Sequence, residues 1–382
     1  MYRVVLIHPG AGVNWKGYSE NFAIELARSL DNYFEVELIS GADCGSFSHP
    51  ISCITSGEVA NWEYFPLVDR LLRRWFSDPA IAIEHLTSFL PCITYLLKNP
   101  PDLIFPHNGY GGLFVAHCIR AILDTPIVFM EHGSQLNFNE HLKRNLALKP
   151  DCTIVPNPAV AKYVKQIAPH QSLNVIPYGV DPQEFTPVGK TMIVGLPKPT
   201  ILCVAPLERD GNSRIELTIQ AVSRLPQASL LICGNGSDRD YFQKLGDRLL
   251  GANRFQINTF AYAQMPQIYR SADVFTLPSL TAFGGLAYIE AMACGLPIVA
   301  TDDAVRRYLI GDAGITCDVT DIELYATSLQ IALDRYWLKQ QPVSNAERFS
   351  WQKVGLHHYK TILRTINKSE NNHFTISSGQ HF

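Results

Sequence analysis

The sequence predicts an α/β protein built from two doubly wound parallel sheets, one after the other along the chain. Its 382 residues exceed what one hydrophobic core usually organises, so we expect two domains. Short apolar runs typical of strands alternate with helical patterns, which is the signature of parallel sheets. Residues 181–200 are rich in proline and indicate a linker between two similar series. We therefore expect an N-terminal domain over residues 1–185 and a C-terminal domain over residues 195–350.

The first series opens with a strand, a helix and a strand in "YRVVLIH", "SENFAIELARSL" and "FEVELIS", and continues with the strands "DLIFPH", "PIVFMEHG", "CTIVPN" and "NVIPYG". Between Asp43 and Lys98 the alternation loosens, which indicates an insertion over the first sheet. Within it, "VDRLLRRWF" combines leucines with Arg70, Arg73 and Arg74. This segment is either a basic amphipathic helix in peripheral contact with a membrane or an ordinary packed helix with solvated arginines.

The second series repeats the pattern, with strands in "TILCVAP", "ASLLICG", "FQINTF" and "DVFTLPS". We expect a last helix, "WQKVGLHHYKTILRTI", over residues 351–366, beginning after a Ser350 cap and packing back toward the first domain. The polar residues 368–382 are expected to form a disordered tail.

Composition narrows the partners and the compartment. Charged residues make up 18% of the chain and the net charge is -3, so no global charge favours nucleic acid as a partner. The 9 cysteines form no C-x-x-C pair, and several, such as Cys203, lie in apolar runs, which favours reduced core thiols and a cytoplasmic protein. The opening "MYRVVLIHPG" has no signal-peptide pattern. The longest apolar run, from Ile81, is interrupted by Glu84, His85 and Pro91, so it predicts one or two protein helices.

The segment "TAFGGLAYIEAMACGLPIVAT", residues 281–301, combines a glycine turn with a short helix that contains one charged residue. The turn Phe283-Gly284-Gly285 leaves backbone N–H groups available at a helix start, where a phosphate can bind without a side chain. Glu290 is the one charged residue in the apolar run that follows. From this segment alone, Glu290 is equally well explained as a ligand-binding carboxylate or as one satisfied by a neighbouring loop.

The loop "HPGAGVNWKG" follows the first strand and begins like a dinucleotide-binding fingerprint. Gly10 and Gly12 fit that pattern, but Trp15 stands where the third glycine belongs, which argues against an oxidoreductase. Gly17 would let a donor diphosphate or an acceptor approach the backbone, or it serves plain turn geometry.

Two further positions are candidates for a site. His132 ends a strand at the carboxyl edge, where open α/β sheets place ligands, although a lone histidine is more often structural. Asp238-Arg239-Asp240 mimics a metal-binding Asp-x-Asp motif, but it starts a helix after a glycine turn. We therefore expect Ser237 or Asp238 to cap that helix, and we expect no metal site.

Three segments, in sequence order, resemble the family 4 glycosyltransferases. They are "VIPYGVDPQEFTP", "LLICGNGSDRDYFQKL" and "YRSADVFTLPSLTAFGGLAYIEAMACGLPIVAT", and the similarity covers nearly all of residues 1–365. The resemblance implies the GT-B fold, two Rossmann-like domains facing across a cleft. It also implies that Glu290 is the second glutamate of an E-x7-E motif that binds the donor's ribose, and that His132 lies near the transferred sugar.

The implied activity is retaining, metal-independent transfer of a sugar from a nucleotide-diphosphate donor, without a cofactor. The acceptor would be a carbohydrate, a lipid-linked molecule or a small molecule. The implied donor site includes Gly17, Phe283, Gly284, Gly285 and Glu290.

The chain departs from the family at three positions. Ala282 replaces the first glutamate of the motif, and Pro206 and Ser213 stand near the positions of an arginine and a lysine that neutralise the diphosphate. Arg209 and Arg214 lie close by, and Arg209 is the sequence candidate for stabilising the leaving diphosphate. These departures leave two alternatives open: a non-catalytic GT-B subunit or partner of an active transferase, and a GT-B sugar-nucleotide epimerase.

Overall fold

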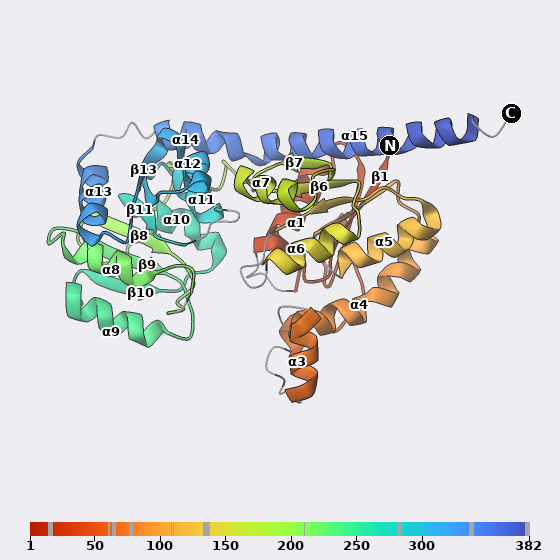
Figure 1. Cartoon of the computed structure of the whole chain (residues 1–382). Helices are drawn as coiled ribbons and strands as arrows, with labels where there is room; N and C mark the ends of the chain where they lie inside the picture. The colour runs from red at the N-terminus through yellow and green to blue at the C-terminus, as the bar shows by residue number, and fades with distance from the viewer. Residues whose placement is uncertain are drawn as a thin grey trace. The chain divides into compact units, whose positions relative to one another are not determined.

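The chain folds into two compact units, which Figure 1 shows as ribbons. The computed structural model describes residues 1–13, 18–59, 62, 66–75, 79–107, 109, 111–132, 138–209, 211–280, 285–335 and 340–378. The first unit is Met1–Pro177 with Trp351–Phe382, and the second is Tyr178–Ser350. Each unit is built of parallel strands with helices around them, so the α/β class that the sequence predicts is confirmed.

The first unit contains two parallel sheets joined by a bridge. One has the order β3-β2-β1-β4 and the other β5-β6-β7. A parallel bridge between Ile104 and Ile127 connects them, so β4 and β5 are neighbours. The strands are β1 Arg3–His8, β2 Glu35–Ser40, β3 Ser48–Pro50, β4 Leu103–Pro106, β5 Val128–Met130, β6 Cys152–Val155 and β7 Leu173–Val175.

The helices of the first unit follow local sequence signals. Asn157 caps α7 by accepting from the Val160 N–H at 3.0 Å, and Pro158 occupies the first turn, where its missing N–H costs nothing. α4 is one continuous helix despite Pro91. The helices are α1 Tyr18–Leu30, α2 Ser56–Val59, α3 Pro66–Trp75, α4 Pro79–Lys98, α5 Gly112–Leu123, α6 Phe138–Ala147, α7 Pro158–Ile167 and α15 Trp351–Ser378.

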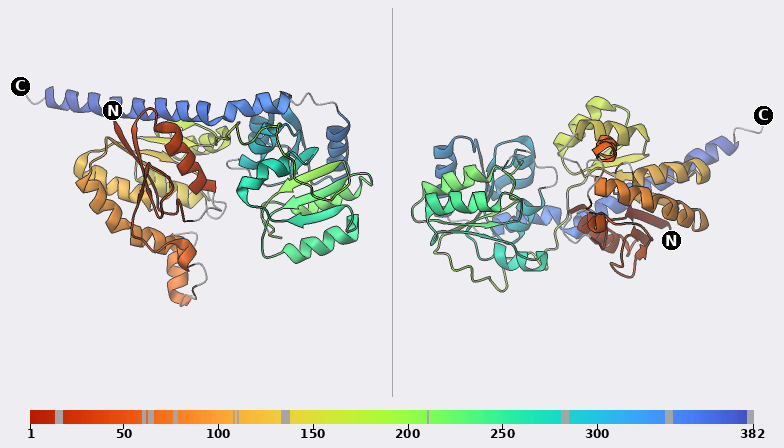
Figure 2. Two further views of the ribbon diagram at one scale, coloured as in Figure 1. Left: turned by 180° about the vertical axis from the view of Figure 1, so that it is seen from behind. Right: turned by 90° about the horizontal axis from the view of Figure 1, so that it is seen from below.

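Helix α15 lies along α1, as Figures 1 and 2 show. The Tyr33 and Tyr359 rings stack with centroids 4.5 Å apart. The helix continues to Ser378, so the tail predicted from residue 368 is wrong up to that point. Once a helix is established, each added residue makes a backbone hydrogen bond without needing tertiary contacts. The Tyr2 hydroxyl also donates to Glu370 at 3.2 Å.

The second unit contains a six-stranded parallel sheet with the order β10-β9-β8-β11-β12-β13. This is the Rossmann strand order, in which the order of the parallel strands reverses between the first and fourth strands, here β8 and β11. The strands are β8 Thr200–Val204, β9 Ser229–Cys233, β10 Phe255–Asn258, β11 Val274–Leu277, β12 Ile298–Thr301 and β13 Gly314–Cys317.

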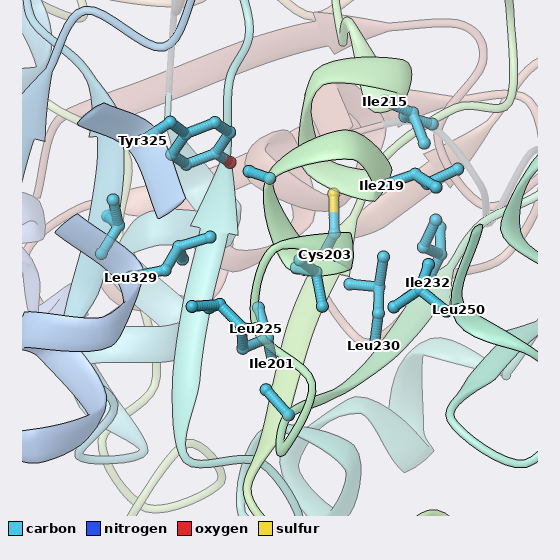
Figure 3. Packing of buried hydrophobic residues seen from close by; sticks show 14 of the residues in the cluster. Ile201, Cys203, Ile215, Ile219, Leu225, Leu230, Ile232, Leu250, Tyr325 and Leu329 are labelled. Carbon is cyan, nitrogen blue, oxygen red and sulfur yellow. The ribbon is translucent and has the colours of Figure 1, made fainter. Parts of the chain in front are cut away.

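Helices cover both faces of this sheet, because successive strand residues point to opposite sides. Ile201 and Cys203 pack with α8, α9 and α13, as Figure 3 shows for α8 and α13, whereas Leu202 packs in a separate core with α10, α11 and α12. The helices are α8 Ile215–Ser223, α9 Arg239–Leu250, α10 Met265–Tyr269, α11 Leu286–Ala293, α12 Ala304–Ile310, α13 Ile322–Asp334 and α14 Gln340–Ala346, with the 3-10 turns η1 Tyr262–Gln264, η2 Gly311–Ala313 and η3 Glu347–Phe349.

The predicted linker is instead packed on the second unit. Val180 and Phe185 are buried in its core. The Arg270 guanidinium donates to the carbonyls of Thr186 at 3.0 Å and Lys190 at 2.8 Å. The boundary therefore falls at Pro177, because apolar residues among the prolines find partners in the second unit that the local sequence does not indicate.

Candidate functional site

Two of the residues predicted for the donor site, Gly285 and Glu290, lie on the segment that follows β11, beside the switch point of the second sheet. The segment after β8 leads to α8, and the segment after β11 leads to α11. In sheets of this order, ligands bind outside the carboxyl ends of the strands at the switch point. Ala282, Phe283 and Gly284 lie outside the described residues, as does Gly17 in the first unit, and Gly285 and Glu290 are described.

Gly285 begins α11 with a backbone that favours glycine. Its φ is 64°, in the left-handed region. A Cβ there would also lie 2.3 Å from Cδ1 of Leu309. Within the described residues no side chain caps α11, so the N–H groups of Leu286 and Ala287 are available for an anion, whereas those of Tyr288 and Ile289 donate to the Gly285 carbonyl.

Glu290 lies on α11 with both carboxylate oxygens hydrogen-bonded. The Tyr262 hydroxyl donates to Oε1 at 2.7 Å and the Tyr269 hydroxyl to Oε2 at 2.8 Å. Burial raises the pKa of Glu290 to about 7, although the two tyrosine hydrogen bonds act to lower it. Tyr269 is fully buried, whereas Tyr262 is 45% exposed. Oε2 is thus bonded to the hydroxyl of a buried tyrosine, whereas Oε1 is bonded to the hydroxyl of a tyrosine that is partly exposed to solvent.

Arg209 contacts α9. Its guanidinium carbon lies 4.4 Å from the Tyr241 ring centroid, and its backbone N–H donates to Asp238 at 2.9 Å. Asp238 does occupy the N-cap position of α9, but its side chain makes no capping hydrogen bond, which corrects the expected cap. Its carboxylate instead holds the segment after β8. Among the described residues, no group of three or more His, Cys, Asp or Glu side chains could hold a metal ion.

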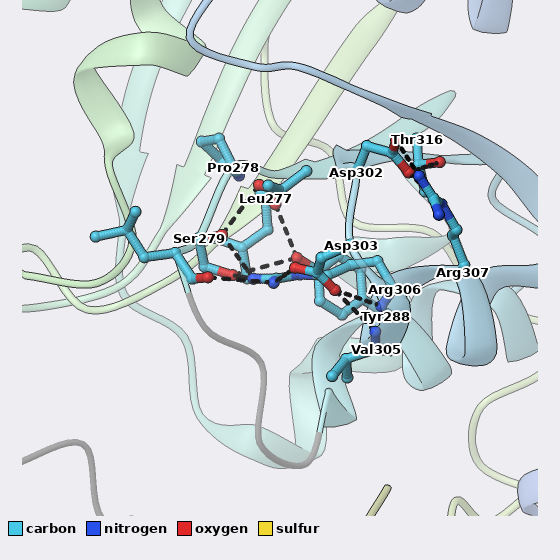
Figure 4. A network of polar contacts seen from close by, with 12 residues as sticks. Leu277, Pro278, Ser279, Tyr288, Asp302, Asp303, Val305, Arg306, Arg307 and Thr316 are labelled. Carbon is cyan, nitrogen blue, oxygen red and sulfur yellow. Dashed lines mark hydrogen bonds and ion pairs between the residues drawn. The ribbon is translucent and has the colours of Figure 1, made fainter. Parts of the chain in front are cut away.

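Two other arginines meet at the carboxyl end of β11, as the network in Figure 4 shows for Arg306. Arg306 is buried, donates to the Ser279 carbonyl at 2.6 Å and forms an ion pair with Asp303. Arg214 donates through Nε to the Pro278 carbonyl at 2.6 Å and through Nη2 to the Ser279 carbonyl at 3.4 Å. Sequence reasoning noted Arg214 as a nearby cation and missed Arg306, which carries no motif signal of its own.

His132 lies in a buried cluster of histidines in the first unit. Its Nε2 is 3.2 Å from Nδ1 of His107. His8 ends β1, His107 follows β4 and His132 follows β5, so three neighbouring strands each place a histidine at the same edge. His358 of α15 completes the cluster around Phe22, whose ring centroid is 5.2 Å from that of His132 and 5.8 Å from that of His358.

Burial keeps these imidazoles neutral. It lowers the pKa of His132 to about 3 and that of His358 to about 4, and it lowers the pKa values of His8 and His107 as well. Nδ1 of His8 and Nε2 of His107 and His358 have no hydrogen-bond partner among the described residues. Sequence reasoning missed the other three histidines, although two of them end recognisable strands.

The sequence matches two family descriptions. "Glycosyltransferase Family 4" matches residues 19–184, and "Glycosyl transferases group 1" matches residues 194–349. A phosphatidyl-myo-inositol mannosyltransferase of Mycolicibacterium smegmatis is 32% identical over 312 residues, which cover 78% of this chain and 75% of that protein. The sulfoquinovosyl transferase SQD2 of Arabidopsis thaliana is 24% identical over 290 residues, 68% of this chain and 56% of that protein. The chain spans about half the length of several other curated relatives that it matches.

Two solved structures show the same fold. A sucrose-phosphate synthase of Thermosynechococcus elongatus matches with a TM-score of 0.76 at 19% identity, over 95% of this chain and 99% of that one. Anabaena HepE, in complex with UDP-glucose, matches with a TM-score of 0.68 at 18% identity, over 95% of this chain and 100% of that one. The fold is therefore that of the GT-B glycosyltransferases. The chain belongs to glycosyltransferase family 4, which confirms the resemblance of its motifs.

The histidine cluster predicts that acid destabilises the first unit. A histidine whose pKa is about 6.5 unfolded and lower when folded binds more protons in the unfolded state, so stability is full above about pH 6.5 and falls as the pH drops toward about 4. Each such histidine contributes a slope of roughly 1.4 kcal/mol per pH unit in this window. Hydrogen exchange of β1 and β4 amides at pH 7, 6 and 5 measures the effect. Replacement of His358 by Leu should reduce the slope of unfolding free energy against pH by the contribution of about one histidine. A wild-type free energy of unfolding that is the same at pH 7 and pH 5 would contradict the prediction.

Proposed function

We propose that this chain is a retaining, metal-independent glycosyltransferase that moves a sugar from a nucleotide-diphosphate donor to an acceptor hydroxyl. The observation that carries the proposal is Glu290, a buried carboxylate on the helix that follows the switch-point strand β11. Its Oε1 faces Tyr262, which is partly exposed, so a ribose hydroxyl could donate there as that tyrosine moves aside. The uncapped start of α11 at Gly285 would receive the diphosphate, together with the predicted turn through Phe283 and Gly284.

The names of relatives and neighbours support this donor class. HepE was solved with UDP and with UDP-glucose, and a Corynebacterium glutamicum relative is named as GDP-mannose-dependent. In the reaction proposed here, the bond between the anomeric carbon and the diphosphate breaks while the acceptor oxygen bonds to that carbon from the same face. The acceptor's proton passes to the departing phosphate oxygen. His132 would contact the transferred sugar as a neutral imidazole, since burial lowers its pKa to about 3.

A second candidate function is a non-catalytic subunit that retains the fold. It is favoured by Ala282, Pro206 and Ser213, which replace charged residues of the family pattern, and by the contact of Arg209 with Tyr241. Such a subunit would keep the fold of the donor domain without stabilising a leaving diphosphate.

We further propose a lipid-linked acceptor and a cytoplasmic protein in peripheral contact with a membrane. Curated relatives are named for phosphatidylinositol substrates. In the first unit, Leu67 and Leu71 of α3 are 67% and 51% exposed, four residues apart on one helix face that also presents Arg70. α4 is long and apolar enough to cross a membrane by length and composition alone, and 39% of its most apolar stretch is buried inside the fold.

Titration calorimetry with UDP, GDP and ADP tests the donor proposal. We expect one of them to bind wild-type protein, and Glu290→Gln to weaken that binding roughly 10- to 100-fold, the range for losing a hydrogen bond to a charged group. Because the pKa of Glu290 is about 7 and a ribose hydroxyl prefers the ionised carboxylate, wild-type affinity should rise with pH through that value. The Gln variant should lose this rise.

Tyr269→Phe is the matched control, because it removes the buried donor to Oε2 and leaves Oε1 untouched. It should lower stability by about 1–3 kcal/mol. Nucleotide affinity should stay unchanged at a pH well above 7, where Glu290 is ionised in both proteins, because loss of the Tyr269 hydrogen bond raises the pKa of Glu290. If none of the three nucleotides binds folded wild-type protein at millimolar concentration, the enzyme proposal fails and the non-catalytic subunit replaces it.

A contact between His132 and the transferred sugar makes a separate prediction. His132→Ala should lower turnover far more than affinity for the bare nucleoside diphosphate, which lacks that sugar. His358→Ala removes another buried imidazole of the same cluster and should cost stability without this split. Equal losses of turnover and affinity in His132→Ala would place the residue in the scaffold.

Flotation with lipid vesicles tests the membrane contact of α3. The double variant Leu67→Ser, Leu71→Ser should bind phosphatidylcholine–phosphatidylserine vesicles at least about tenfold more weakly than wild type, because each inserted leucine contributes roughly 1.5–3 kcal/mol. Leu249→Ser, on α9 of the second unit, is the control for loss of an exposed leucine. Equal vesicle binding by wild type and the double variant would exclude this face.

A further inference from the structure

The diphosphate of a donor would meet neutral residues at two positions where the family tends to place cations. Pro206 and Ser213 stand near those positions. The sequence candidate, Arg209, has its guanidinium over the Tyr241 ring on α9. A leaving diphosphate still requires charge stabilisation, so another cation at the switch point has to supply it.

Arg214 is fixed at that point by groups from two strand ends. Its φ of 50° lies in the left-handed region, which is uncommon for a residue other than glycine and concentrates at functional sites. Nε donates to the Pro278 carbonyl at 2.6 Å, just after β11, and Nη2 donates to the Thr301 hydroxyl at 3.1 Å, at the end of β12. Nη1 donates to no group within the described residues, and the side chain is partly exposed.

The charges around Arg214 leave an excess of positive charge. Arg306 donates to the Ser279 carbonyl, which also accepts a hydrogen bond from Arg214 Nη2. Arg306 is paired with Asp303, and its buried Nε has no partner within the described residues. Asp302 is paired with Arg307. Asp318 also acts on Arg214, but it is exposed and accepts hydrogen bonds from Thr320. Arg214 therefore has no ion-pair partner of its own among the described residues.

We propose that Arg214 binds the donor diphosphate through Nη1. Arg306 holds the Ser279 carbonyl in place, and that carbonyl in turn positions the Arg214 guanidinium. This inference rests on the proposed donor site. A guanidinium whose other N–H groups already hold the backbone is preorganised, so it stabilises developing charge without having to reorder. The uncapped start of α11 would supply backbone donors to the same anion.

Titration calorimetry of full-length protein with UDP, GDP and ADP, over a range of salt concentrations, tests the assignment. For whichever nucleotide binds wild type, Arg214→Gln should lower affinity roughly 10- to 100-fold and weaken its salt dependence. Arg248→Gln, which removes an exposed arginine of α9, is the matched control and should change affinity less than about fivefold. Arg214→Lys keeps the charge without the planar fork, so it should retain the salt dependence with intermediate affinity.

The outcomes separate the two proposals. If wild type binds none of the nucleotides, the donor site itself fails, and this assignment fails with it. If wild type binds but folded Arg214→Gln binds equally well, or if Arg209→Gln produces the loss instead, only the role of Arg214 is overturned. If Arg214→Gln does not fold, Arg214→Lys decides: an affinity below that of wild type with retained salt dependence supports the assignment, and wild-type affinity in the folded variant contradicts it.

Discussion

In a parallel sheet every strand ends at the same edge, so residues far apart in the sequence gather there without any specific contact to bring them together. Both units of this chain depend on that constraint. In the second unit it places Arg214 within hydrogen-bonding distance of the Pro278 carbonyl and the Thr301 hydroxyl, although β8, β11 and β12 are separated along the chain. In the first unit it gathers His8, His107 and His132. The switch point then determines where along the carboxyl edge of the sheet a ligand can bind.

The two units solve the problem of buried polar groups in different ways. The second unit surrounds its buried ionisable groups with partners: tyrosine hydroxyls at Glu290, whose pKa burial raises to about 7, and a carboxylate and backbone carbonyls at Arg306. The first unit keeps the histidines of its buried cluster, His8, His107, His132 and His358, neutral, because burial lowers the pKa of each below its ordinary value. Burying a charge is costly unless it is paired, whereas a neutral imidazole loses less on leaving water. The first unit therefore depends on pH in a range where the arginine network of the second does not titrate.

The alternation of strands and helices and the family could be predicted from the sequence, because they depend on local patterns. The partners of Glu290 could not. Tyr262 and Tyr269 are 28 and 21 residues away, and nothing in "AYAQMPQIYR" marks them as donors to a carboxylate. The packing of residues 181–200 was missed for the same reason, since proline content indicates irregular backbone and does not say what that backbone touches.

The choice between Arg209 and Arg214 shows where local reasoning ends. Both arginines lie in "PLERDGNSR", with the same charge and similar reach, so the sequence gives no physical reason to prefer one of them. In the fold they separate because the segment turns between them, with Arg209 held toward α9 by Asp238 and Arg214 brought by its left-handed backbone onto β11 and β12. A left-handed backbone costs a non-glycine residue free energy, and it persists only where the surrounding contacts compensate. At Arg214 those contacts are the hydrogen bonds of its own side chain, so the strain and the placement of the guanidinium are coupled.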